Sequence, residues 1–305
     1  MRILVTGANG FLGSALVNLL TLKNVEVIAL STSKFNEIQD LENSLIRRMT
    51  LAPNLWKESV SKYSPDIAIL CDWNGVDRNK RKLESQSENV VRWTELCTSL
   101  IDSGVGKIVA LGSQAEVSNN QDMVDEETPF SPRNEYGHAK KMAFNGLSKL
   151  CERSGISFVW GRIFSLYGNK MSRNSFLSEL ATNLILNREC LLSPCNQVWN
   201  FLHVDDCSEA LWALASSRDS IGIYNLASPS SISLRMVANF LADIEGRKNL
   251  LRFGAREYSE REVMVMSPST LRIQNLGWRQ EIEIWDGLTS LYMDFKNRLT
   301  LSNKT

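Results

Sequence analysis

A tyrosine and a lysine four residues apart form the first pair of side chains that could do chemistry. Tyr136 and Lys140 stand near the start of the segment 135–153, whose apolar residues recur at helical spacing. Residues four apart share one face of a helix. An ammonium group beside a phenol stabilises the phenolate, so the pair could transfer a proton near neutral pH. Chance also produces this spacing often, and the pair alone is a weak signal.

A hydroxyl residue upstream adds to this pair. Ser113 ends the apolar stretch 109–113, which is typical of a buried strand. Ligands of parallel α/β sheets bind beyond the carboxyl ends of the strands. Ser113 could therefore hydrogen-bond a substrate oxygen while Tyr136 transfers the proton.

Glycines at every third position near the N-terminus predict a phosphate-binding turn. Gly7, Gly10 and Gly13 directly follow the apolar run 3–5. Such glycines allow a sharp turn, a close approach of backbone N–H groups to a pyrophosphate, and tight packing of the next helix on the strand. Phosphates are favoured at the helix N-terminus. The candidate cofactor-binding residues are Gly7, Asn9, Gly10, Phe11, Leu12 and Gly13; a glycine-rich turn without a ligand is the alternative.

The end of the second predicted strand bears on the choice of dinucleotide. An Asp or Glu there would bind the ribose hydroxyls of NAD. The sequence instead continues with small hydroxyl residues and a cation, namely Ser31, Thr32, Ser33 and Lys34. This composition suits a 2′-phosphate and favours NADP over NAD, unless the residues only form a polar loop.

The elements that would position these residues alternate between strand and helix. Strands are predicted at 3–5, 25–30, 67–71, 108–111 and 156–160, and helices at 90–101, 135–153 and 175–186. This order is typical of a doubly wound parallel sheet of the α/β class. We expect a dinucleotide-binding domain at 1–165 and a smaller substrate-binding lobe at 166–305, partly interleaved with the first.

Composition argues against several other classes of protein. The 34 Lys and Arg balance the 34 Asp and Glu, so no net charge attracts nucleic acid. The sequence predicts neither a signal peptide nor a membrane-spanning helix, and we expect a cytoplasmic protein. The six cysteines contain no Cys-x-x-Cys pair, and with two histidines the chain offers no clustered metal ligands.

Taken as a whole, the chain resembles the extended short-chain dehydrogenases/reductases of the NAD-dependent epimerase/dehydratase family, which act on nucleotide sugars. The resemblance rests on Asn89 and on the stretches 6–13, 66–73, 111–116, 129–140, 162–168, 199–206 and 276–278. Within the family, 111–116 and 162–168 are most similar to the nucleotide-sugar 4-ketoreductase branch, which includes CDP-abequose synthase.

The resemblance implies a Rossmann-type fold and a set of residue roles. It implies catalysis by Ser113, Tyr136 and Lys140, with Lys140 also holding the nicotinamide ribose. Cofactor contacts are expected at Asn89, Phe164 and Ser165, and nucleotide-sugar contacts at Gln114, Arg173, Trp199 and Arg261. Trp199 is more simply explained as a core residue, and each single arginine as a solvated surface charge. The family also implies a homodimer through helices at 88–101 and 136–150.

Departures from the family pattern narrow the reaction. Dehydratases of the family place an acidic pair where this chain has Gln114 and Ala115, and many epimerases and dehydratases have Asn in place of Ser165. Asp72 replaces a small apolar residue beside the expected cofactor. The prediction is reduction by NAD(P)H of the 4-keto group of a nucleotide-linked 6-deoxyhexose. The alternatives are an NAD-dependent 4-epimerase and a non-catalytic regulator that senses dinucleotides.

Overall fold

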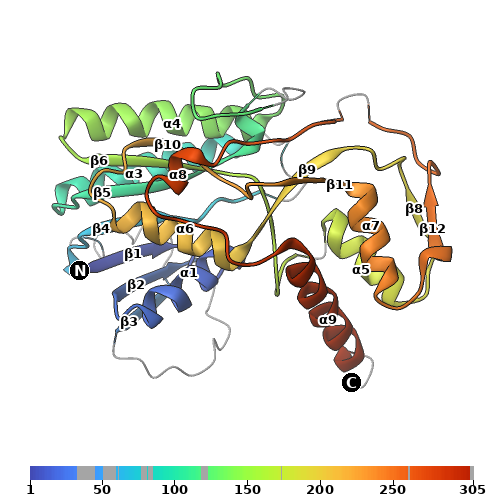
Figure 1. The fold of residues 1–305 in the computed structure, drawn as a ribbon. Helices are drawn as coiled ribbons and strands as arrows, with labels where there is room; N and C mark the ends of the chain where they lie inside the picture. Colours follow the sequence, from blue (N-terminus) through green and yellow to red (C-terminus); the bar gives the residue numbers. More distant parts are fainter. Residues whose placement is uncertain are drawn as a thin grey trace.

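A parallel sheet forms the centre of the molecule (Figure 1). The computed structural model describes residues 1–32, 45–50, 60, 62–76, 81, 85–117, 123–172, 174–259 and 262–302. Within these residues the large sheet has seven strands in the order β10-β6-β5-β4-β1-β2-β3. Their bounds are β1 Arg2–Thr6, β2 Glu26–Ser31, β3 Ile46–Thr50, β4 Ile67–Leu70, β5 Lys107–Ser113, β6 Ser157–Ile163 and β10 Gly222–Leu226.

The strand order reverses direction next to β1. From β1 the chain adds β2 and β3 on one side, and then crosses back to place β4, β5 and β6 on the other. In the register, Thr6 of β1 lies beside Leu70 of β4 and Leu30 of β2. The connections leaving β1 and β4 therefore diverge at the carboxyl edge. Doubly wound sheets bind their ligands in the crevice at such a point.

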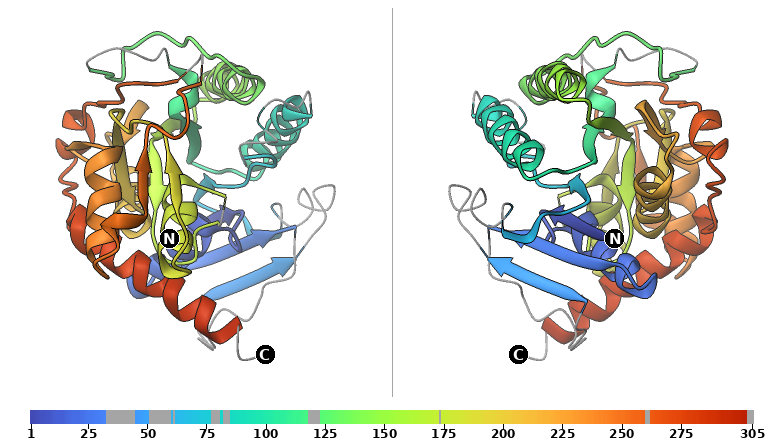
Figure 2. Two further views of the ribbon diagram at one scale, coloured as in Figure 1. Left: turned by 90° about the vertical axis from the view of Figure 1, so that its right-hand side faces the viewer. Right: turned by 90° about the vertical axis from the view of Figure 1, so that its left-hand side faces the viewer.

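Helices cover both faces of the large sheet (Figure 2). The helices α1 (Phe11–Leu22) and α6 (Val204–Ser216) pack together on one face, and α3 (Gln86–Asp102) and α4 (Glu135–Arg153) on the other. Successive side chains of a strand point to opposite faces. Accordingly Ile3 and Val5 join the core under α1 and α6, while Leu4 joins the core under α3 and α4.

A smaller group of elements with its own core follows β6. Its three-stranded sheet has the order β11-β9-β7, and β12 pairs with β8. The bounds are β7 Ser165–Tyr167, β8 Cys190–Leu192, β9 Val198–His203, β11 Ser231–Ser233, β12 Leu251–Phe253, α5 Phe176–Ile185, α7 Leu234–Asp243, α9 Ile284–Ser302 and the 3₁₀ turn η3 Lys248–Leu250. Two short elements lie outside this group: the 3₁₀ turn η2 Gln114–Glu116 follows β5, and α8 Leu271–Gln274 contacts β10. Helices α5, α7 and α9 enclose the apolar core of this region. Although both follow residue 165, β10 is a strand of the large sheet and α6 packs against this sheet, so the division into lobes at 165/166 stays a proposal.

The predicted fold class is confirmed. The helix expected at 135–153 has these same bounds in α4, and each of the five predicted strands overlaps an observed strand of the large sheet. Strand β3 was not predicted, because its sequence, Ile-Arg-Arg-Met-Thr, lacks a clear apolar pattern. As an edge strand that pairs only with β2, it needs no second hydrophobic face.

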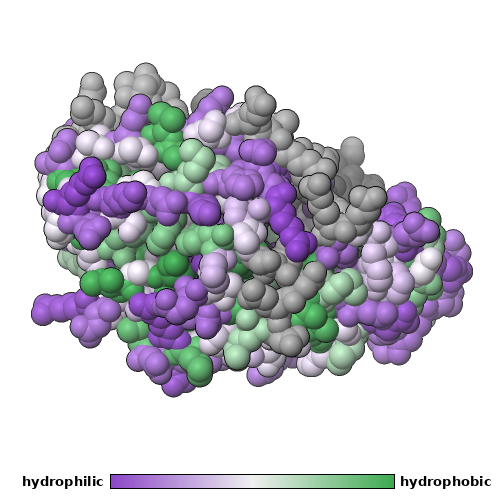
Figure 3. Space-filling view, turned by 90° about the horizontal axis from the view of Figure 1, so that it is seen from above, coloured by the Kyte–Doolittle hydropathy of each residue, from purple (hydrophilic) through white to green (hydrophobic). Residues whose placement is uncertain are grey.

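Three observations concern the surface, the helices and the possible metal ligands. In Figure 3 hydrophilic residues dominate the face seen from above, and hydrophobic ones form small separate groups among them. Throughout the described part of the chain, no helix combines the length and the apolar character that crossing a membrane requires. Nor do three His, Cys, Asp or Glu side chains of the described residues gather as metal ligands would.

Candidate active site

The turn between β1 and α1 has the geometry of a phosphate cradle. Gly7 has φ +62°, and a Cβ on Gly13 would lie 2.1 Å from the Gly7 carbonyl oxygen, so side chains are excluded at both positions. Helix α1 begins after Gly10 without a side-chain cap and without an acidic residue in its first turn. Backbone N–H groups at such a helix N-terminus attract phosphate. Among the other predicted residues of this turn, Asn9 and Phe11 are half-buried and Leu12 is buried.

The predicted ribose-recognition segment is only partly described. Ser31 is the last residue of β2 and is buried, and Thr32 after it is exposed. Ser33 and Lys34 lie outside the described residues, as do Arg173 and Arg261. No carboxylate follows directly on β2 at Ser31 or Thr32.

The structure brings Ser113 and Tyr136 together. Ser113 ends β5 and caps the short turn η2, where its Oγ accepts a hydrogen bond from the Ala115 N–H at 3.2 Å. Helix α4 begins beside this turn because the Asn134 side chain caps it, accepting from the Gly137 N–H at 2.9 Å. A Cβ on Gly137 would lie 2.3 Å from the Ala115 carbonyl oxygen, so α4 can approach η2 this closely only with glycine there. The Ser113 side chain then lies near enough to the Tyr136 phenol to lower its pKa.

Opposing effects act on the acidity of Tyr136. Its side chain is 6% exposed, and burial raises the pKa of Tyr136. The Arg81 guanidinium, with Cζ 5.2 Å from the ring centroid, lowers this pKa, as does the nearby Ser113 side chain. The Arg81 carbonyl also accepts the Tyr136 backbone N–H at 3.0 Å. Sequence reasoning missed Arg81, since it stands among other charged residues with no distinguishing spacing.

Lys140 lies beneath the surface beside two tryptophans. The lysine is 2% exposed, and its Nζ donates to the Leu111 carbonyl at 2.7 Å. The same nitrogen is 3.7 Å from the centroid of the Trp73 ring and 4.3 Å from that of Trp93. It lies 5.9 Å from the centroid of the Tyr136 ring. Burial lowers the pKa of Lys140 to about 7, although the negative charges of Glu116 and Asp72 raise it.

Asp72, the residue for which sequence reasoning had no account, is bound on several sides by protein groups. Arg92 donates to its Oδ2 from Nε at 3.1 Å and from Nη2 at 2.8 Å. Its Oδ1 accepts the Trp93 indole N–H at 3.1 Å and the Thr6 hydroxyl at 2.5 Å. The carboxylate is thus neutralised by Arg92 and anchors Trp93.

Glu116 is a buried carboxylate that holds the end of β5. Its Oε1 accepts the Ser113 backbone N–H at 2.6 Å, and its Oε2 accepts the Trp160 indole N–H at 3.0 Å. Arg162, with Nε 3.6 Å from Oε2, forms an ion pair with it, and both side chains are 0% exposed. Burial raises the pKa of Glu116, while Arg162 and the hydrogen bonds oppose this. Because these contacts engage both oxygens, Glu116 fixes the position of Ser113.

The remaining predicted residues differ in what they contact. Asn89 is buried, and its amide binds both the N–H and the carbonyl of Asn74, so it fixes the segment after β4. Phe164 is buried and Ser165 half-buried; they directly follow Ile163, the register partner of Ser113. Oε1 of Gln114, next to Ser113, is buried and has no hydrogen-bond partner among the described residues. Trp199 lies on β9, where its indole N–H donates to the Val263 carbonyl at 3.2 Å.

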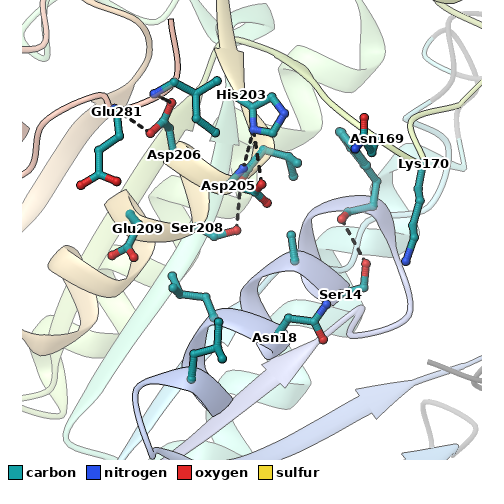
Figure 4. A pocket seen from close by; sticks show the side chains of 16 residues that line it. Ser14, Asn18, Asn169, Lys170, His203, Asp205, Asp206, Ser208, Glu209 and Glu281 are labelled. Atoms are coloured by element: carbon teal, nitrogen blue, oxygen red, sulfur yellow. Dashed lines mark hydrogen bonds and ion pairs between the residues drawn. The ribbon is translucent and has the colours of Figure 1, made fainter. Parts of the chain in front are cut away.

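A cavity of about 400 Å³ lies elsewhere, between α1, α6 and the segment at Asn169 and Lys170 (Figure 4). His203 caps α6 there, its Nδ1 accepting the Asp205 N–H at 3.3 Å. Asp206 accepts the backbone N–H groups of Glu281 and Ile282 at 2.9 and 3.1 Å. These contacts give His203 and Asp206 structural roles at the start of α6.

Fold and phosphate cradle together define a Rossmann-type α/β protein. Residues 3–227 match the model of the family described as NAD dependent epimerase/dehydratase family, and the chain belongs to this family. The resemblance predicted from the sequence motifs is therefore confirmed.

Relatives in this family carry out several reactions on nucleotide sugars. The dTDP-6-deoxy-L-talose 4-dehydrogenase (NAD(+)) of Aggregatibacter actinomycetemcomitans is 25% identical over 271 residues, covering 86% of this chain and 98% of the relative. CDP-abequose synthase of Salmonella muenchen is 22% identical over 296 residues, covering 95% and 96%. In fold, the chain is similar to DesIV, a dTDP-glucose 4,6-dehydratase from Streptomyces venezuelae solved with NAD bound. For that structure the TM-score is 0.88, the identity 20%, and the coverage 99% of this chain and 98% of DesIV.

Proposed function

We propose that this protein reduces the 4-keto group of a nucleotide-linked 6-deoxyhexose with NAD(P)H. The observation that carries the proposal is the grouping of Ser113, Tyr136 and Lys140 at one strand end beside the phosphate cradle. The acidic residue of this turn, Glu116, is buried and bound to Trp160 and Arg162, so it cannot reach a substrate as an elimination base. A reductase needs no such base.

Each member of the triad has a distinct task in this mechanism. A nicotinamide dinucleotide, when bound, supplies the hydride that reaches the ketone carbon. Ser113 holds the ketone oxygen by a hydrogen bond, and Tyr136 gives its phenol proton to that oxygen as negative charge develops. Lys140 stabilises the resulting phenolate by its positive charge. Arg81 adds a second cation beside the phenol.

The residues of the cradle suit a dinucleotide, and we propose NADPH rather than NADH. The uncapped N-terminus of α1 would hold the pyrophosphate, with Gly7 and Gly13 allowing the tight turn and the close packing of the helix on it. Ser31 and Thr32, at the end of the strand that would face the adenosine ribose, carry hydroxyls rather than a carboxylate. Since a 2′-phosphate would be repelled by a carboxylate there, we assign NADP as the preferred cofactor, with Ser33 and Lys34 completing the site.

The predicted substrate contacts differ in how well their surroundings suit a bound nucleotide sugar. Gln114 has a buried side-chain oxygen without a partner in the described chain, and it adjoins the residue proposed to hold the ketone oxygen. A sugar hydroxyl would satisfy this oxygen. Trp199 already uses its indole N–H within the protein and offers the nucleotide only its half-buried ring. Arg173 and Arg261 stay candidates for the diphosphate on sequence grounds.

Stoichiometry tests the proposal against its alternatives. Purified protein is mixed with a nucleotide-linked 4-keto-6-deoxyhexose and NADPH, the cofactor absorbance is followed, and the product is weighed by mass spectrometry. We expect one NADPH consumed per product molecule that gains two hydrogens. Interconversion of two sugars of equal mass with retained NAD would establish the epimerase instead. Dinucleotide binding without turnover across a panel of nucleotide sugars would favour the regulator.

The family also leads us to propose a homodimer. Helices α3 and α4 lie side by side on one face of the sheet, and they expose Val91 and Met142. Two copies meeting through these helices would bury both side chains. Light scattering should give twice the chain mass of 34.4 kDa for the native protein. Replacing both Val91 and Met142 by glutamate should reduce the measured mass to that of one chain.

A further inference from the structure

Two indole rings enclose the ammonium group of Lys140. Trp73 and Trp93, here called the aromatic cage, have ring centroids 4.8 Å apart and planes at 86° to each other. The Lys140 nitrogen lies 3.7 Å from the first centroid and 4.3 Å from the second, within cation–π distance of both. Trp93 is fully buried and Trp73 is half-buried, so Trp73 is the wall between Lys140 and solvent.

Hydrogen bonds from neighbouring elements fix both rings. The Trp73 indole N–H donates to Gln86 Oε1 at 2.7 Å, and Gln86 in turn donates to the Gly75 carbonyl at 2.9 Å. The Trp93 indole N–H donates to Asp72, which Arg92 neutralises. Neither ring can turn away without breaking a bond to a buried or paired side chain. The cage is therefore a built part of the site, and Asp72 is one of its anchors.

We propose that Trp73 is a positioning residue for catalysis, because it holds the Lys140 ammonium in a dry aromatic cage beside Tyr136. The role of Trp73 in catalysis rests on the proposed function. In this arrangement Lys140 donates to the Leu111 carbonyl rather than toward the cradle.

The charged groups around Lys140 set the direction of the expected effects. Glu116 of η2, together with Asp72 and Cys71 after β4, raises the pKa of Lys140, whereas Arg92 of α3 lowers it. Tyr136 faces it from α4. Desolvation outweighs these charges and lowers the pKa of Lys140 to about 7. Removing Trp73 admits water to the ammonium and should raise the pKa of Lys140. The reason is that two cation–π contacts of about 1–2 kcal/mol each offset only part of the penalty that burial imposes on the charged lysine.

Titration of the lysine in the free protein tests the cage without any substrate. Lysine side chains are labelled with ¹³C, and the Lys140 signal is assigned by its absence in Lys140→Met. Trp73→Ala should move the titration midpoint upward by at least about one pH unit, whereas Trp73→Phe, which keeps an aromatic wall, should move it by less than about half a unit. Trp212→Ala, on the opposite face of the sheet, is the matched control and should leave it unchanged. If the alanine variant unfolds, Trp73→Leu should give an intermediate upward shift.

Kinetics then connect the cage to catalysis. We expect the alkaline limb of the kcat profile to move upward in Trp73→Ala by the same amount as the lysine midpoint, and Trp73→Phe to restore it. If the Lys140 titration midpoint does not move in Trp73→Ala, or moves equally in Trp73→Phe and Trp73→Ala, the proposal of an aromatic cage is wrong. A uniform loss of kcat without displacement of the limb also contradicts the positioning role. A shifted midpoint in a protein without reductase turnover would instead reject the proposed function and leave the cage intact.

Discussion

Replacing Lys140 by methionine should lower turnover by an amount that depends on pH. Methionine keeps a long apolar side chain in the buried site and removes only the ammonium group. Lys140 Nζ lies 5.9 Å from the centroid of the Tyr136 ring. At that distance and an effective dielectric constant of about 20, one positive charge stabilises a phenolate by roughly 2.8 kcal/mol. This corresponds to about a hundredfold in the acidity of the phenol and, at most, in the rate.

The pH dependence follows from the direction in which the lysine is perturbed. Because burial lowers the pKa of Lys140 to about 7, the wild-type ammonium is charged below that pH and loses its charge above it. The ratio of wild-type to Lys140→Met kcat should be about a hundredfold near pH 6 and approach a few fold near pH 9. Steady-state assays with NADPH and the keto sugar measure this ratio. Dinucleotide titration by fluorescence serves as a control, and affinity should change by less than about threefold.

One result would refute this reasoning. A ratio that stays constant from about pH 6 to pH 9 would show that Lys140 does not act through a charge lost near neutral pH. A large loss of dinucleotide affinity with little change in kcat would show that the lysine holds the cofactor instead. The first result removes the electrostatic role, and the second replaces it with the ribose contact that the family implies.

Three further substitutions test other parts of the site. Tyr136→Phe keeps the buried ring and removes the proton donor, so kcat should fall by about a hundredfold or more with unchanged dinucleotide affinity; turnover within a few fold of wild type would exclude Tyr136 as the acid. Ser31→Asp should shift the ratio of kcat/KM values from NADPH toward NADH, with thermal unfolding as a control because the position is buried; a wild type that already prefers NADH would contradict our interpretation of the loop. Glu116→Gln leaves the buried Arg162 without its ion pair and should lower the free energy of unfolding by about 3–5 kcal/mol in urea; a loss below about 1 kcal/mol would mean that Arg162 is stabilised by other groups.

The sequence by itself determined the class of the protein and the residues most open to recognition by spacing. Apolar periodicity predicted α4 with its observed bounds and five strands of the large sheet, since each buries its side chains at a regular interval. The glycines at 7, 10 and 13 predicted the cradle, and at 7 and 13 the backbone geometry tolerates no side chain. The spacing of Tyr136 and Lys140 predicted a shared helix face, which needs no knowledge of the rest of the chain.

Only the tertiary structure decided what surrounds the proposed catalytic groups. Asp72 is 20 residues before Arg92 in the sequence, and Glu116 is far from Arg162. In the fold, Asp72 nevertheless pairs with Arg92, and Glu116 with Arg162. Such pairs follow from which strand ends and helix faces meet, and no local pattern encodes them. The same holds for Trp73 and Trp93, which read as ordinary apolar residues and enclose Lys140 only because α3, α4 and the end of β4 converge. The charge state of that lysine is a property of the assembled fold, since burial sets it and burial depends on residues distant in the chain.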